Sequence, residues 1–133
     1  MRKRNLLDSF AVLAFLKKES KYQTVLALLN DAKEGRGDLL MNQINAGEVY
    51  YQVLKRGLTH NIYKFWRTFL MLPIEFLAND FDLVLKAARI KSRYAISFAG
   101  CFAVATAIRE KASIVTGDPE FKQVEKIVSV EWM

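Results

Sequence analysis

The chain has 133 residues, enough for one compact domain, and folding at this size buries roughly two-thirds of the surface that the unfolded chain exposes. Hydrophobic residues make up 52% and charged residues 26%, a balance that argues against a disordered chain, and no apolar run reaches the roughly 18 residues of a membrane span. The net charge of +6 suits a polyanionic partner such as nucleic acid, although the same excess is common in proteins that bind none.

Short apolar segments alternate with amphipathic ones along the chain, which predicts strands alternating with helices. In chain order we expect a strand at 5–7, helices at 9–18 and 22–33, a strand at 38–42, helices at 45–56 and 60–72, a strand at 74–77, helices at 80–93 and 97–111, a strand at 113–116, a short helical piece at 120–125 and a last strand at 127–130. This alternation favours parallel pairing and a three-layer α/β fold, with helices flanking a central parallel sheet.

The organisation of the chain is simple. No linker, repeat or low-complexity segment divides it, so we expect a single domain over residues 1–133. The first residues are basic, but the apolar stretch after them contains Asp8 at once and has no small-residue cleavage site. We therefore expect a cytoplasmic protein with no membrane contact.

Most catalytic machinery that a sequence can reveal is missing. The single cysteine, Cys101, excludes an internal disulfide and a cysteine-cluster metal site. The single histidine, His60, excludes a mechanism that uses two imidazoles. There is no glycine-rich phosphate-binding motif. The remaining candidates are carboxylates, which bind hard cations such as Mg²⁺.

Three acidic residues fall near the carboxyl ends of predicted strands, where ligands bind in parallel α/β sheets. Asp8 follows strand 5–7, Asp118 follows strand 113–116, and Glu48 lies early in the helix after strand 38–42. Taken singly, each has an ordinary explanation as a helix cap, a turn residue or a solvated helix residue. Together on one edge they would repel one another unless a cation neutralised them. Such a cation lowers the pKa of a bound water and assists in-line attack on a phosphodiester.

Four segments, in order along the whole chain, resemble the motifs of the PIN domain and, more narrowly, those of VapC-type toxins of bacterial and archaeal toxin–antitoxin pairs. They are residues 6–14 (LLDSFAVLA), 45–51 (NAGEVYY), 95–105 (AISFAGCFAVA) and 116–121 (TGDPEF). The last segment is among the more specific signatures of the family. The resemblance implies an endoribonuclease that depends on Mg²⁺ or Mn²⁺ and has four acids around the metal.

The resemblance also implies roles for individual residues. Carried over, Asp8, Glu48 and Asp118 are the first, second and fourth acids, serving as catalytic residues and metal ligands. Ser9 and Thr116 are polar residues near the site. The implied partners are a cognate antitoxin and an RNA substrate, and the implied oligomer is a homodimer.

The third acid is missing, because members of the family usually have Asp where this chain has Gly100. If Ser97 caps the helix, Gly100 is its third residue, where an acidic side chain would complete a capping box and interact favourably with the helix dipole. Glycine there costs up to about 1 kcal/mol relative to alanine. Either the acid was lost in a weakened or inactive homologue, or an inactivating substitution was introduced into a toxic nuclease. We favour the second, since Asp and Gly codons differ by one base.

Gly100 therefore predicts weak binding of Mg²⁺ or Mn²⁺ and reduced cleavage, both restored by Gly100→Asp. The main alternative is a non-catalytic PIN module that binds RNA or an antitoxin without cutting. A phosphoacceptor receiver domain also places acids at strand ends. However, it needs paired acids after the first strand and a lysine after the last, whereas this chain has only Asp8 there.

Overall fold

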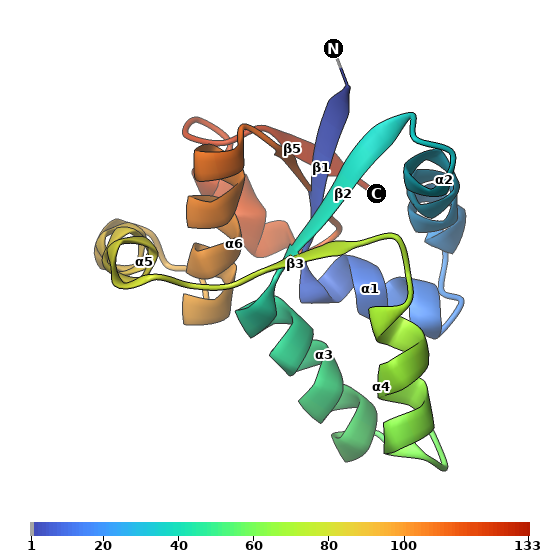
Figure 1. The fold of residues 1–133 in the computed structure, drawn as a ribbon. Coiled ribbons are helices and arrows are strands. Elements are labelled where there is room, and N and C mark those ends of the chain that lie inside the picture. Colours follow the sequence, from blue (N-terminus) through green and yellow to red (C-terminus); the bar gives the residue numbers. More distant parts are fainter. Residues whose placement is uncertain (1) are drawn as a thin grey trace.

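A computed structural model describes residues 2–133 as a five-stranded sheet with helices on both faces (Figure 1). The strands are β1 (Lys3–Leu7), β2 (Gly37–Asn42), β3 (Glu75–Leu77), β4 (Ser113–Thr116) and β5 (Val130–Trp132), in the spatial order β3-β2-β1-β4-β5. Every pair of neighbouring strands is parallel. The predicted α/β fold with a central parallel sheet is confirmed. Within residues 2–133, the structure has no helix with the length and apolar character needed to span a bilayer.

Helices connect each strand to the next, as parallel pairing requires. They are α1 (Ser9–Leu16) and α2 (Tyr22–Lys33), α3 (Gln43–Lys55) and α4 (Ile62–Leu70), α5 (Phe81–Arg93) and α6 (Phe98–Glu110), and the short 3₁₀ helix η1 (Pro119–Val124). These elements match the predicted ones to within one or two residues at each end.

The last strand differs from its prediction at 127–130. Ile127 and Val128 donate their backbone N–H groups to the Val124 carbonyl, at 3.0 and 3.1 Å, so the chain continues as a turn after η1. Val128 is buried in the core without pairing in the sheet. Pairing begins only at Val130, which lies opposite Ile114 of β4. The apolar pattern was correct about burial and wrong about backbone conformation.

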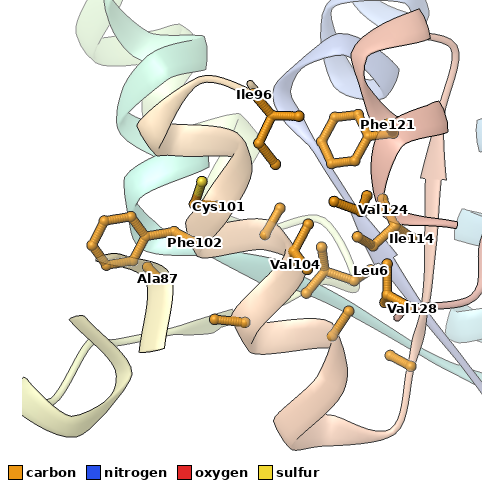
Figure 2. Close-up of a cluster of buried hydrophobic side chains, with 14 of the residues drawn as sticks. Leu6, Ala87, Ile96, Cys101, Phe102, Val104, Ile114, Phe121, Val124 and Val128 are labelled. Atoms are coloured by element: carbon orange, nitrogen blue, oxygen red, sulfur yellow. The ribbon is translucent and has the colours of Figure 1, made fainter. Parts of the chain in front are cut away.

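Adjacent residues of the central strand β1 face opposite layers of the protein. Leu6 packs into a cluster formed with α5, α6 and η1, whereas Leu7 packs into a cluster formed with α1 to α4. Both side chains are fully buried. Figure 2 shows the first cluster, in which Leu6 lies among side chains from α6, β4 and η1. The sheet is thus covered on both faces, as expected for parallel strands.

Candidate functional site

The carboxyl ends of three neighbouring strands bring the predicted acids together. Because β1 lies between β2 and β4, the residues that follow these strands meet at one edge of the sheet. A cavity of about 40 Å³ at this edge, which we call the acidic cavity, is lined by Asp8, Ser9, Asn45, Glu48, Ser97, Gly100, Asp118, Glu120 and Phe121. The structure therefore brings together five of the residues singled out from sequence, and the sixth, Thr116, is hydrogen bonded to Asp8.

Asp8 both caps a helix and faces the other acids. Its side chain is 4% exposed. One carboxylate oxygen accepts a hydrogen bond from the Ala11 N–H at 2.8 Å, which caps α1, and the other accepts one from the Thr116 hydroxyl at 2.5 Å. The Asp8 side chain therefore serves both as the cap of α1 and as part of the candidate site.

Burial raises the pKa of Asp8 to about 7, because an ionised carboxylate loses its hydration there. The hydrogen bonds from Thr116 and Ala11 oppose this rise, and the negative charges of Asp118 and Glu48 add to it. A positive ion in the acidic cavity would reverse the balance by favouring the ionised form. The electrostatics of Asp8 thus suit a bound cation.

Hydrogen bonds hold the other two acids in place. Glu48, on α3, accepts a hydrogen bond from the Ser9 hydroxyl at 2.5 Å. Asp118 caps η1 by accepting the Glu120 N–H at 3.0 Å, and its own N–H donates to the Thr116 hydroxyl oxygen at 3.0 Å. Thr116 therefore joins Asp8 to Asp118 through a single side chain.

Gly100 lies where its place in the sequence predicted, at the third position of α6. The Ser97 hydroxyl oxygen caps the helix by accepting the Gly100 N–H at 3.0 Å. A Cβ atom added to Gly100 would lie 2.7 Å from Glu120 Oε1 and 3.0 Å from Ser97 Oγ. The space beside Gly100 is therefore already occupied by another carboxylate.

Four residues that line the acidic cavity were not proposed as site residues from the sequence, namely Asn45, Ser97, Glu120 and Phe121. Glu120 Oε1 accepts hydrogen bonds from both the N–H and the hydroxyl of Ser97, at 3.2 and 3.0 Å. Asn45 donates its amide to the Ala99 carbonyl at 3.0 Å, while its buried Oδ1 has no hydrogen-bond partner within residues 2–133. Spacing would have revealed Asn45, because it precedes Glu48 by three residues on one helix and shares its face.

The donors around the acidic cavity suit a hydrated hard cation. Among the described residues, no group of three or more His, Cys, Asp or Glu side chains is arranged so that it could hold a metal ion by these side chains alone. Mg²⁺, however, is usually held by one or two carboxylates and keeps several waters. The lining acids and the unpartnered Asn45 Oδ1 present only oxygen ligands. A cavity of about 40 Å³ has room for an ion and a few waters, since one water needs about 10–15 Å³.

Comparisons with known proteins agree on one fold. The family model described as PIN domain matches residues 6–127. Among solved structures, VapBC2 from Rickettsia felis bound to a promoter DNA fragment superposes with a TM-score of 0.72 at 20% identity, covering 97% of this chain and 98% of that chain. DNA-bound VapBC from Salmonella typhimurium gives 0.71 at 16% identity, covering 99% and 98%, and FitAcB from Neisseria gonorrhoeae gives 0.68 at 19%, covering 95% of each. At these identities the likeness concerns the fold. No curated protein matches the sequence.

Proposed function

This chain belongs to the PIN domain family, and we propose that it is an endoribonuclease dependent on Mg²⁺ or Mn²⁺ that acts as the toxin of a toxin–antitoxin pair in the cytoplasm. The observation that carries the proposal is the convergence of Asp8, Glu48 and Asp118 on the acidic cavity at the carboxyl edge of the sheet. A nuclease needs such a concentration of negative charge only if a cation is to be held there.

The chain's own residues would hold the ion and orient the site. Asp8, Glu48 and Asp118 supply carboxylate oxygens, and Asn45 Oδ1 supplies a neutral one. Ser9 and Thr116 fix the orientation of the acids through their hydroxyl groups. When bound, the ion supplies an activated water and neutralises charge on the phosphodiester. The net charge of +6 favours the approach of the RNA backbone.

A non-catalytic PIN module that binds RNA or an antitoxin is the second candidate. The observation that favours it is Gly100, which leaves α6 without a carboxylate at the position where the family usually has one. Under this alternative the fold and the partner surfaces persist while cleavage is weak or lost. The two candidates are distinguished by whether the chain cuts RNA.

An antitoxin partner and a homodimer are parts of the same proposal. The similar structures named above include VapBC assemblies bound to DNA. In this chain, large apolar side chains stand exposed on α3 and α4, among them Tyr51 at 49% and Tyr63 at 80%, and on α5, where Phe81 is 74% exposed. Exposed apolar side chains of this kind suit contacts with other chains. Light scattering after size exclusion would refute the dimer by showing only monomer at micromolar concentration.

The decisive experiment is RNA cleavage by the purified chain. Structured and single-stranded RNAs are incubated with Mn²⁺ or Mg²⁺ and, separately, with EDTA. We expect slow cleavage with the metal, as Gly100 implies, none with EDTA, and none by Asp8→Asn. Asp31→Asn, which removes a carboxylate from α2 outside the acidic cavity, should cleave like the wild type.

Two results would redirect the assignment. Tight RNA binding without cleavage by the wild type would favour the non-catalytic module. Cleavage that persists in Asp8→Asn and in EDTA would refute the metal site. The toxin role has its own test, because a companion reading frame for a small DNA-binding protein immediately upstream is expected, and its absence would contradict that role alone.

A further inference from the structure

We infer that Glu120 of η1 supplies the fourth carboxylate of the acidic cavity, in place of the acid that α6 lacks at Gly100. The inference rests on the proposed metal-dependent function and identifies a ligand outside the four acids that the resemblance implies. With Glu120 in this role, Gly100 does not reduce the negative charge of the acidic cavity. The fourth carboxylate comes from η1 and not from α6.

The first argument is position. A Cβ atom at Gly100 would lie 2.7 Å from Glu120 Oε1. An Asp side chain would start from that Cβ, so the Glu120 carboxylate fills the volume that an acid at position 100 would need. Both residues line the acidic cavity together with Asp118, which precedes Glu120 by two residues. The Glu120 carboxylate therefore reaches the same place from η1.

The second argument is helix capping. In a capping box, the acid at the third helical position accepts the N–H of the capping residue. Gly100 has no side chain to do so, and the Ser97 N–H instead donates to Glu120 Oε1 at 3.2 Å, with the Ser97 hydroxyl donating at 3.0 Å. Glu120 thus makes, from a distant part of the chain, the bond that an acid at position 100 would make within α6.

The backbone beneath Glu120 is well anchored. The adjacent Phe121 is 2% exposed, and Val124 is fully buried, so η1 is fixed against the core on its inner side (Figure 2). Only Oε1 of Glu120 is hydrogen bonded among the described residues, which leaves Oε2 without a protein donor. One oxygen therefore positions the carboxylate, and the other remains for a ligand.

A separate observation points to a ligand in this cavity. Asn45 is 1% exposed and lines the acidic cavity, and its Oδ1 has no hydrogen-bond partner in the described part of the chain. Its amide is held by the carbonyl of Ala99, the residue before Gly100. Buried acceptors are almost always satisfied, so this oxygen requires a water or a cation. A hydrated cation among the four carboxylates would satisfy it.

The arrangement alters what Gly100→Asp should do. Introduced alone, the substitution would displace the Glu120 carboxylate, which is the end of a flexible side chain and can move at low cost, so one carboxylate would replace the other. We expect the single substitution to leave affinity for Mn²⁺ unimproved. In a variant without the Glu120 carboxylate, an acid at position 100 should be able to act as a metal ligand.

The test is calorimetric titration of the full chain with Mn²⁺ alone, at neutral pH. Glu120→Gln keeps an oxygen that can accept from Ser97 and removes the charge, and we expect its Mn²⁺ affinity to fall about tenfold or more. Glu125→Gln is the matched control, since it removes the same charge just after η1 and outside the acidic cavity. It should bind within about twofold of the wild type.

A transplant experiment separates charge from structure. Glu120→Ala should bind Mn²⁺ weakly, and adding Gly100→Asp to it should recover affinity to within about threefold of the wild type. Adding Gly100→Ala to the same background fills the space without charge and should recover nothing. Thermal unfolding of each variant verifies that it is folded.

The outcomes distinguish the inference from the proposed function. Unchanged Mn²⁺ affinity in Glu120→Gln, with affinity lost in Asp8→Asn, would overturn the role of Glu120 and leave the metal site standing. Equal recovery by Gly100→Ala and Gly100→Asp would likewise overturn it. No binding of Mn²⁺ by the wild type would overturn both the inference and the proposed function.

Discussion

Replacing Asp8 by Asn should stabilise the metal-free protein at neutral and alkaline pH, although it destroys the site. Asn keeps an oxygen that can accept the Ala11 N–H, so the cap of α1 survives. It removes a carboxylate that is 4% exposed and must ionise among other acids. The variant therefore loses the free-energy penalty of a buried charge.

The magnitude follows from the raised pKa. In the unfolded chain the carboxyl titrates near 3.8, and in the folded protein at about 7. Below pH 3.8 both states hold the proton and the group has no effect on stability. Between these values only the folded state keeps the proton, so the unfolding free energy falls as pH rises toward 7. The difference of about three pKa units corresponds to about 4 kcal/mol of unfolding free energy.

The assay is urea unfolding of the wild type and Asp8→Asn at pH 5 and pH 8, with EDTA present. The variant's stability relative to the wild type should rise by about 2–3 kcal/mol between these two pH values, because about two of the three pKa units lie between them. Asp31→Asn, whose side chain is 48% exposed in the wild type, is the control and should show no such rise. An Asp8→Asn variant whose relative stability is the same at pH 5 and pH 8 would refute the reasoning.

Other substitutions test the contacts around the site and the core. Thr116→Val removes the hydroxyl that donates to Asp8, so it should raise the pKa of Asp8 further, measurable by carboxyl NMR titration, and lower stability by about 1–3 kcal/mol. Ser97→Ala removes the cap of α6 and should lower the unfolding free energy by about 1 kcal/mol, measured by urea unfolding. Leu6→Ala empties a fully buried position of β1 and should lower it by about 2–5 kcal/mol in the same assay.

The fold was predictable because hydrophobic patterning and helix caps act locally. Asp8, Ser97 and Asp118 each precede a helical segment and cap it as their types favour. The last strand was mispredicted because Ile127 and Val128 are apolar and β-branched, which predicts burial more reliably than it predicts pairing.

The sequence could predict only those residues of the candidate site that lie near the ends of strands. Asp8 and Asp118 follow neighbouring strands, and topology alone places them at one edge. Glu120 could not be found in this way, since its contact with Ser97 depends on how η1 packs against α6 in three dimensions. The unpartnered Oδ1 of Asn45 likewise depends on which atoms surround it, and no pattern of residue types reports that.

The hydrogen bond between Asp8 and Thr116 has a consequence for how the protein is made. Its two residues are 108 positions apart, and β1 pairs with β4 only once that late segment exists. Asp8 therefore emerges from the ribosome long before Thr116 and Asp118. Contacts between residues so far apart in the sequence form late in folding. A nascent chain that lacks β4 has no assembled acidic cavity, because Thr116 and Asp118 are missing from it. Any activity at that cavity would begin only after Thr116 and Asp118 have left the ribosome.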